Sequence, residues 1–175
     1  LLVPSASNTK DGVITPHLAP WLRHFKGLHG SEGKEPHRKI VVLRPGAKTR
    51  RMTNSDELLL ALKGWETVVL ETMTIREQMK TFAEATHIVA AHGAGLVNLL
   101  WCKPGTKVIE IQDTNMIHKK VYPILSHHLG LKHELYLADT VPIKLQSGKK
   151  PKGIKRLSDL INFKIDVPDL LKYLD

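Results

Sequence analysis

The segment of this chain with the clearest chemical potential is His92-Gly93-Ala94-Gly95-Leu96. An apolar run at 88–91 precedes it and a mostly apolar stretch at 97–101 follows, so it reads as a strand end, a turn and a helix start. Backbone N–H groups and the positive end of a helix dipole meet anionic ligands at such junctions. The segment therefore indicates phosphate binding, although two glycines also occur where a chain simply turns tightly.

A second segment, residues 44–51, carries cations directly after the apolar run 40–43. These cations are Arg44, Lys48, Arg50 and Arg51. The planar guanidinium of arginine bonds two phosphate oxygens at once and keeps its charge. Ligands of doubly wound folds bind at the carboxyl ends of the strands, so we expect these cations and the glycine turn to share one crevice. The alternative is a solvated basic loop.

Three further side chains are candidates for ligand contacts. His92 could donate a hydrogen bond to a phosphate or sugar oxygen and is a candidate for a catalytic role, or it is a buried histidine that ties the turn together. Glu110, near the end of the next apolar run, could accept hydrogen bonds from ribose hydroxyls or pair with a nearby lysine. Asn98 stands where a dinucleotide fingerprint has its third glycine, which argues against an NAD site but leaves a phosphate or ribose contact open.

The elements that position these residues follow from the hydrophobic pattern. Apolar runs rich in β-branched residues predict strands at 40–43, 68–70, 88–91, 108–111 and 135–137. Helical patterns fall between them at 55–63, 75–85, 94–101 and 117–129. We expect Thr74 and Glu77 to form a capping box, Gly130 to end the last of these helices, and Cys102 to lie in the core. The alternation predicts an α/β, doubly wound, mainly parallel sheet.

The length predicts one domain over residues 1–175. Residues 1–38 are expected to form a lead-in, with a helix at 15–25 and a polar loop at 27–37. Residues 146–175 form a tail, in which 146–153 is a basic loop. Segments 158–161 and 168–174 of this tail are predicted as one or two short helices.

The amino-acid composition narrows the range of possible functions. The net charge is +9 and the pI about 9.7, so the surface should attract polyanions or phosphorylated small molecules. Aromatic residues make up only 5% and are not interleaved with the basic ones, which makes nucleic acid an unlikely partner. No histidine spacing predicts a metal site, and His127-His128 would point to different faces of a helix.

A single cysteine excludes an internal disulfide framework, and no asparagine begins an Asn-X-Ser/Thr acceptor. Both features favour the cytoplasm. No apolar run reaches the roughly 20 residues of a membrane span. The chain begins at Leu1 rather than methionine, so we expect a piece of a longer protein, which would be lumenal or membrane-associated if a leader or anchor preceded it.

Several motifs in linked order resemble the C-terminal half of glycosyltransferase family 61. These motifs are Ile40-Val41-Val42-Leu43-Arg44, Thr49-Arg50-Arg51, Glu77-Gln78, the segment 92–98, Pro104-Gly105 and Val108-Ile109-Glu110-Ile111. The resemblance spans residues 39–137, with a weaker echo in 163–174. The family includes protein O-linked N-acetylglucosaminyltransferases, plant xylan-decorating transferases and bacterial capsule enzymes.

This resemblance implies the Rossmann-like, donor-binding half of a GT-B enzyme that transfers a sugar with inversion to a glycan or protein hydroxyl. A UDP-sugar would be the donor substrate, with no tightly bound cofactor and no metal. Arg44 and either Arg50 or Arg51 would face the diphosphate together with the turn, and Glu110 would lie near the ribose. Met73 and Thr74 would border the nucleobase, and Glu77 and Gln78 would face the cleft.

The same resemblance implies that an acceptor-binding lobe is missing from this chain. The catalytic base, the transferred sugar and the acceptor are therefore not identified. The first alternative is a noncatalytic basic α/β domain that binds nucleic acid or another acidic partner. A nicotinamide-dependent oxidoreductase is a weaker alternative because the third glycine is absent.

Overall fold

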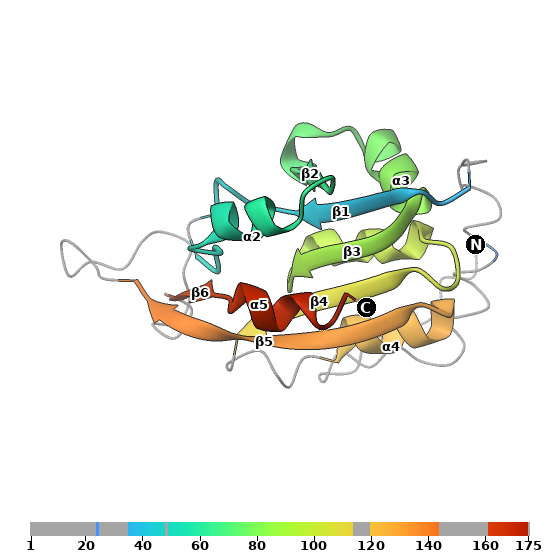
Figure 1. Ribbon diagram of the computed structural model, residues 1–175. Helices are drawn as coiled ribbons and strands as arrows, with labels where there is room; N and C mark the ends of the chain where they lie inside the picture. The colour runs from blue at the N-terminus through green and yellow to red at the C-terminus, as the bar shows by residue number, and fades with distance from the viewer. Residues whose placement is uncertain (1–23, 25–34, 48, 114–119, 144–160, 175) are drawn as a thin grey trace, which may run out of the picture.

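The computed structural model describes residue 24 and residues 35–47, 49–113, 120–143 and 161–174. A six-stranded sheet in the order β2-β1-β3-β4-β5-β6 forms its centre (Figure 1). Its strands are β1 (Arg38–Val42), β2 (Glu66–Val68), β3 (Ala85–Ala91), β4 (Lys107–Asp113), β5 (Lys132–Pro142) and β6 (Ile161–Lys164). The first five are parallel, and β6 pairs antiparallel with β5. The mainly parallel α/β sheet predicted from the sequence is confirmed.

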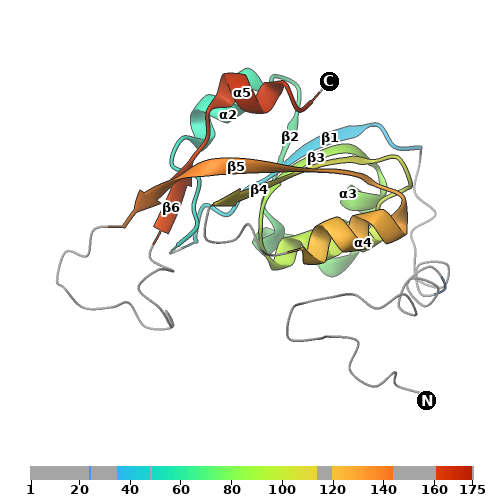
Figure 2. The ribbon, with the colours of Figure 1, turned by 90° about the horizontal axis from the view of Figure 1, so that it is seen from below.

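Helices cover both faces of this sheet. They are the α-helices α2 (Ser55–Ala61), α3 (Ile75–Ala83), α4 (Val121–Leu129) and α5 (Val167–Leu171), and the 3₁₀ helices η1 (Leu70–Thr72) and η2 (Ala94–Trp101). Figure 2 shows α2 and α5 above the sheet and α3 and α4 below it. Each face has its own hydrophobic cluster, and successive residues of β1 alternate between them: Ile40 packs on the α3 and α4 side, Val41 on the other. Burial on both faces explains why the central strands β1, β3 and β4 contain continuous apolar runs.

The strand order has a switch point between β1 and β3. From β1 the chain passes outward to β2 and then returns across β1 to β3, after which β4 and β5 follow on the other side. The loops that leave β1 and β3 at their carboxyl ends therefore run in opposite directions. A crevice opens between such loops, and ligands of doubly wound proteins bind there. The residues after Val42 and after Ala91 are thus placed for ligand binding.

Several local predictions are confirmed. Thr74 and Glu77 form the capping box of α3, and Gly130, with φ +70°, ends α4 in the left-handed region that glycine adopts at no steric cost. The segment 94–101 is helical but of the 3₁₀ type. Leu96, Leu99 and Cys102 recur every three residues and are all buried, which suits the three residues per turn of this helix.

The tail differs from its prediction. The predicted helix at 158–161 is wrong at its last residue, because Ile161 begins the strand β6, while residues 158–160 lie outside the described part. Ile161 and Phe163 are buried and Lys164 is exposed, so a short alternating strand forms at the sheet edge. The predicted helix at 168–174 is found in part as α5, which ends at Leu171. The predicted loop at 146–153, most of the helix at 15–25 and most of the loop at 27–37 lie outside the described residues.

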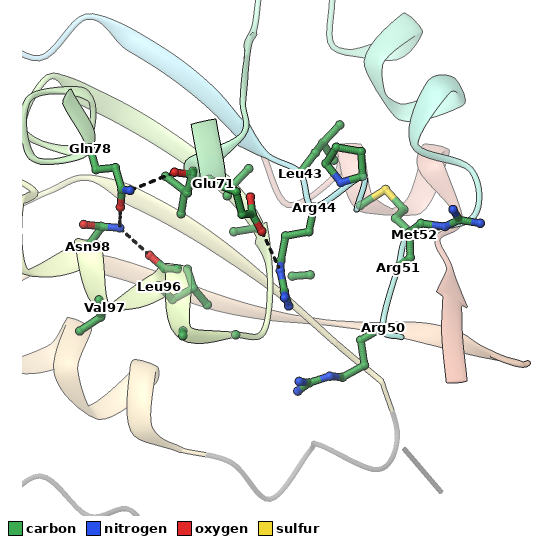
Figure 3. Close-up of a pocket in the computed structure, with 18 of the residues that line it drawn as sticks. Leu43, Arg44, Arg50, Arg51, Met52, Glu71, Gln78, Leu96, Val97 and Asn98 are labelled. Atoms are coloured by element: carbon green, nitrogen blue, oxygen red, sulfur yellow. Dashed lines mark hydrogen bonds and ion pairs between the residues drawn. The ribbon is translucent and has the colours of Figure 1, made fainter. Parts of the chain in front are cut away.

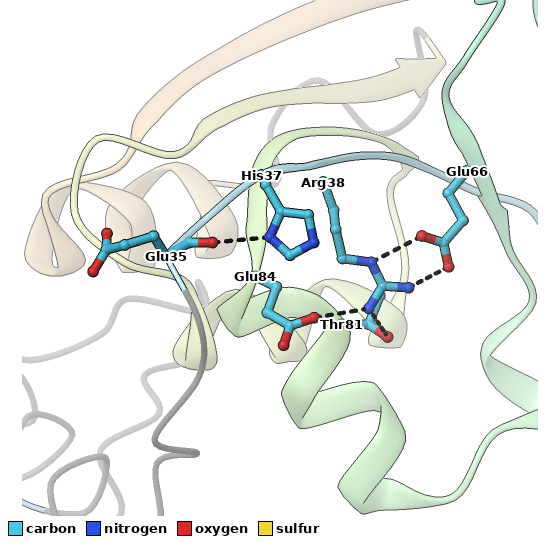
Figure 4. Close-up of polar contacts among 6 residues, drawn as sticks. All are labelled: Glu35, His37, Arg38, Glu66, Thr81 and Glu84. Carbon is cyan, nitrogen blue, oxygen red and sulfur yellow. Dashed lines mark hydrogen bonds and ion pairs between the residues drawn. The ribbon is translucent and has the colours of Figure 1, made fainter.

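A cluster of charged residues lies at the end of the sheet where β1 begins, opposite the carboxyl ends of the strands (Figure 4). The guanidinium of Arg38 binds both carboxylate oxygens of Glu66, with Nε 2.8 Å from Oε2, and this hydrogen bonding raises the pKa of Arg38. It also reaches Thr81 Oγ1 at 3.2 Å and Glu84 Oε2 at 3.4 Å. Arg38 therefore joins the start of β1 to β2 and to the end of α3, which is a structural role remote from the switch point.

No helix among the described residues combines the length and apolar character required to cross a membrane.

Candidate functional site

A pocket of about 880 Å³ lies at the switch point, at the carboxyl ends of β1 and β3 (Figure 3). Its walls come from three segments far apart in the sequence. These are the residues after β1, the arginine loop 50–53, and the glycine turn with the first part of η2. Leu70, Ile75 and Trp101 add apolar wall. Ligand pockets commonly measure about 300–1,000 Å³ and combine an apolar lining with a few polar groups, as this pocket does.

Arg44 and the glycine turn meet in this pocket, as the sequence predicts. A Cβ atom built on Gly93 would lie 3.7 Å from Nη1 of Arg44. Gly93 has φ 170°, an extended conformation that any residue can adopt. Glycine is useful at this position because it places no side chain beside the guanidinium of Arg44. The first N–H groups of a helix have no acceptor within it, and in η2 these belong to Ala94 and Gly95. A cation and helix N–H groups thus converge on one rim.

At position 95, glycine is needed for a different steric reason. A Cβ atom at this position would lie 2.6 Å from Cδ1 of Leu70, closer than real contacts allow. The missing side chain lets the start of η2 pack directly against η1. A larger residue at position 95 would have to displace Leu70, which itself lines the pocket.

The arginine loop is held by β6. Arg50 adopts φ +54°, a left-handed conformation that is costly for any residue except glycine. Its N–H donates to the carbonyl of Ile161 at 2.6 Å, and the N–H of Arg51 donates to Oδ1 of Asn162 at 3.1 Å. Figure 3 shows the Arg50 side chain extending on the side of Arg44, whereas Arg51 points in the opposite direction. The sequence left open whether Arg50 or Arg51 faces the diphosphate. The orientation of the two side chains favours Arg50.

The contribution of β6 to the site was missed in the sequence. Its signal is the four-residue alternation Ile161-Asn162-Phe163-Lys164, which is too short to distinguish a strand from a helix by period. Phe163 lines the pocket and also pairs with Met52 in a bridge, so the tail both shapes the wall and fixes the arginine loop.

Glu71 is a second residue that sequence reasoning missed. It lines the pocket from η1, and its Oε1 lies 3.4 Å from Nε of Arg44. Both side chains are about half exposed, at 57% for Glu71 and 43% for Arg44. Its position directly after the second apolar run, as Arg44 follows the first, is the signal that could have found it. The carboxylate lowers the positive potential at the rim and can exchange for another anion.

Gln78 and Asn98 line the pocket as a hydrogen-bonded amide pair (Figure 3). Asn98 Nδ2 donates to Gln78 Oε1 at 2.9 Å and to the carbonyl of Gly95 at 3.1 Å. Gln78 Nε2 in turn donates to the carbonyl of Leu70 at 3.0 Å. The pair therefore ties α3, η1 and η2 together, and it supports the turn from behind.

Met73, Thr74 and Glu77 do not belong to the pocket walls. Glu77 uses its carboxylate in the capping box, where Oε2 accepts from the N–H of Thr74 at 2.7 Å. The hydroxyl and N–H of Thr74 lower the pKa of Glu77. Met73 packs against the core on the α3 side, and its carbonyl accepts from Gln78 at 3.3 Å. The nucleobase contacts expected at Met73 and Thr74 stay a prediction.

Glu110 is placed differently from its prediction. Its side chain has 0% exposure and accepts hydrogen bonds from His92 Nδ1, from His133 Nε2 at 2.9 Å and from Gln112 Nε2 at 3.0 Å. Burial alone would raise the pKa of Glu110, but these hydrogen bonds outweigh it and lower the pKa to about 2. The ionised carboxylate thus has no surface for a ribose hydroxyl. A ribose contact by Glu110 is not supported.

His92 sits next to the pocket rather than in its wall. Its side chain is 13% exposed, its Nδ1–H donates to Glu110, and its backbone N–H donates to the carbonyl of Ile111 at 2.8 Å. The ring also packs edgewise on Tyr122, with ring centroids 5.3 Å apart. These contacts fit the alternative in which His92 ties the turn to the sheet.

Among the described residues, no group of three or more His, Cys, Asp or Glu side chains could hold a metal ion. His127 and His128 instead contact each other edgewise, with ring centroids 5.8 Å apart.

The fold and the switch-point pocket define the class first: this is a Rossmann-like α/β protein. The sequence model for glycosyltransferase 61 matches residues 1–109, and the chain belongs to this family. It is similar to a β-1,2-xylosyltransferase of Oryza sativa subsp. japonica, with 30% identity over 98 residues, which cover 50% of this chain and 18% of the relative. It is also similar to protein O-linked-mannose β-1,4-N-acetylglucosaminyltransferase 2 of Tetraodon nigroviridis, with 28% identity over 113 residues, covering 62% and 19%. The chain thus spans about a fifth of each relative's length.

Proposed function

We propose that this chain is the donor-binding part of a glycosyltransferase and that its pocket binds a UDP-sugar. Membership of glycosyltransferase family 61 supports sugar transfer in general. The observation that carries the proposal is the approach of the Arg44 guanidinium to the glycine turn at the switch point between β1 and β3. Few ligands need forked cations and helix N–H groups on one rim as strongly as a diphosphate does.

The proposed role of this rim is to stabilise the leaving group. When the bond between the sugar and the diphosphate breaks, negative charge grows on the departing phosphate oxygens. The helix N–H groups at Ala94 and Gly95 and the backbone of Arg50 are fixed by the fold, and Arg44 lies beside the turn, so we propose that their interaction with this charge strengthens towards the transition state. These cations supply the charge that a metal ion supplies in other transferases, and we propose metal-independent transfer.

We propose that transfer inverts the anomeric carbon. The names of both relatives specify β linkages. The usual nucleotide donors of xylose and N-acetylglucosamine carry an α linkage to the diphosphate. A β product then requires the acceptor oxygen to form its bond from the face opposite the leaving group, while the bond to UDP breaks and a base takes the hydroxyl proton.

The acceptor is proposed to be a hydroxyl of a glycan or a protein. The base that receives its proton would lie across the sugar from the diphosphate, as in two-lobed enzymes of the GT-B type. Because the chain spans about a fifth of its relatives, we assign this base to a region outside the chain. The transferred sugar stays open for the same reason.

The competing function is a basic domain that binds nucleic acid or another acidic partner, which the net charge of +9 favours. Calorimetric titration with UDP, UMP and a short oligonucleotide at two salt concentrations separates the two. The proposal predicts saturable binding of one UDP, tighter than UMP, with modest dependence on salt. Oligonucleotide binding that increases with phosphate number and collapses with salt, without preference for UDP, would favour the competing function.

A further inference from the structure

A second pocket, of about 440 Å³, lies at the end of the sheet opposite the proposed donor site. It opens on the face covered by α2 and α5, which lie next to each other in Figure 2. Its walls come from the end of α2, the starts of β1 and β3, and α5 with the residues after it. Its polar and aromatic lining consists of Lys39, Lys63, Trp65, His87 and Lys172, and no Asp or Glu of the described part of the chain is among the lining residues.

The sheet gathers basic side chains at this end. Lys39 of β1 lies beside His87 of β3 in the strand register. His87 lies beside Lys107 of β4, and Lys107 beside Lys132 of β5. Alternate residues further along these strands are buried in the cluster under α2 and α5, so the row faces the same side as the pocket. Like charges on neighbouring strands destabilise a sheet, and only Lys107 has a carboxylate partner in this row, Glu134 at 3.7 Å.

The three lysines of the pocket are available to an anion. Lys39 and Lys63 are exposed and form no ion pair with the residues that the structure describes. Lys172 pairs with Asp169 at 3.1 Å, but its side chain is 75% exposed, so this pair is weak and exchanges readily for another anion. An anion that enters the pocket therefore meets three ammonium groups and displaces no buried carboxylate.

The charge around His87 agrees with this geometry. Burial lowers the pKa of His87, and Lys39 and Lys107 lower it further. The positive potential of the pocket thus extends along the row towards β5. Neighbouring strands lie about 4.8 Å apart, so the row from Lys39 to Lys132 covers about 14 Å. A ligand with several negative charges gains more from such a surface than a single ion does.

Trp65 gives the pocket an aromatic wall. Nζ of Lys39 lies 6.0 Å from the centroid of its ring, and the ring of His87 meets it edgewise with centroids 5.9 Å apart. These contacts hold the partly buried indole among the cations. A sugar ring can lay its C–H groups on such a flat apolar surface, whereas a small inorganic anion gains nothing from it. Lysines around an indole therefore favour a ligand that is both cyclic and negatively charged.

We propose that this second pocket binds an acidic oligosaccharide, one whose sugar rings carry carboxylates. The chain belongs to a family of sugar transferases, so a glycan is a molecule that it meets. The site lies at the amino ends of the strands and the proposed donor site at their carboxyl ends, so the inference goes beyond the proposed function and does not require UDP binding. A glycan held here is tethered to the protein away from the donor pocket.

The test is calorimetric titration with tetragalacturonate, and with cellotetraose as its neutral counterpart, in the presence and absence of UDP. We expect saturable binding of the acidic tetrasaccharide, which UDP does not displace, and clearly weaker binding of the neutral one. Lys39→Gln and Lys63→Gln should each weaken this binding by roughly two- to fivefold. Lys80→Gln, which removes an exposed charge from α3 on the other face of the sheet, is the matched control and should leave it unchanged.

Four results would overturn the inference: no binding of tetragalacturonate, equally tight binding of cellotetraose, displacement by UDP, or the same affinity in Lys39→Gln and Lys63→Gln as in Lys80→Gln. Binding of a pentanucleotide of equal charge as tightly as tetragalacturonate would also overturn it and would identify a surface for nucleic acid instead. Failure of UDP to bind, with tetragalacturonate still bound, would contradict the proposed function alone, so the two failures are distinguishable.

Discussion

At the scale of single residues, the site is a balance between charges of opposite sign. Arg44 is positioned for a phosphate, yet in the free protein its Nε lies 3.4 Å from the carboxylate of Glu71. Both side chains are about half exposed, and pairs of this kind contribute only about 0.2–1 kcal/mol. An arriving diphosphate can therefore displace Glu71 at small cost.

Glu71→Gln should consequently tighten UDP binding by up to about fivefold, because it removes a competing carboxylate from the rim. Isothermal titration against the wild type measures this change. Glu57→Gln, which removes another exposed carboxylate, on α2, serves as the charge-matched control. Weaker binding in Glu71→Gln would instead show that the carboxylate contacts the ligand directly.

Arg50, which we propose as a ligand contact, also carries backbone strain, since it holds φ +54°. Arg50→Gly should raise the free energy of unfolding by up to about 1 kcal/mol, because glycine adopts this conformation without steric cost. The same change should weaken UDP binding by removing a guanidinium. Denaturant unfolding and titration of one protein sample check both effects. A lower free energy of unfolding for Arg50→Gly, together with unchanged affinity for UDP, would contradict both expectations.

At the scale of elements, β6 connects the tail to the arginine loop. Asn162→Ala removes the acceptor of the Arg51 N–H and should weaken UDP binding by about 0.5–1.5 kcal/mol. Asn54→Ala is the matched control, because Asn54 also binds the tail, through Ile165, but does not hold the arginine loop. Equal effects of both variants on UDP affinity would mean that β6 contributes only general stability.

The Glu110 network should make the α4 side of the sheet sensitive to acid. The pKa of Glu110 is about 2 in the folded protein against an ordinary 4.5, so the unfolded chain binds more protons between these values. The free energy of unfolding should therefore fall by about 3 kcal/mol as the pH drops from 4.5 to 2. Denaturant unfolding at several pH values measures this change. The free energy of unfolding of Glu110→Gln should depend less on pH over this range than that of the wild type, and an equally steep pH dependence would argue against the network.

The elements show how far the sequence alone can lead. The central strands β1, β3 and β4 were predictable because burial on both faces leaves apolar runs, whereas β2 covers Glu66–Val68 rather than the predicted 68–70. The meeting of Arg44 with Gly93 followed from the rule that ligands of doubly wound folds bind at the carboxyl ends of the strands. The role of Glu110 was not predictable, because its direction depends on which face of β4 it occupies and on His133, 23 residues away. The strand β6 was not predicted because its four residues are too few to show a period of two.

At the scale of the whole molecule, the two ends of the sheet have different tasks. The Arg38 cluster closes the end where the strands begin, and hydrophobic clusters on both faces keep the sheet in one arrangement. The opposite end is left for the proposed donor site, with the arginine loop and the glycine turn brought together across the switch point. A rigid frame matters here, because electrostatic stabilisation of a leaving group depends on charges that are in place beforehand.

The central claim is that Arg44 and the glycine turn form one diphosphate site. The most direct test is the loss of binding free energy on Arg44→Ala, measured by calorimetry for UDP and for UMP, with Lys132→Ala as a charge-matched control on the first residue of β5. The account predicts a loss of about 1.5–3 kcal/mol for UDP, a clearly smaller loss for UMP and little change in the control. Equal losses for the two nucleotides, or none for UDP, would contradict it.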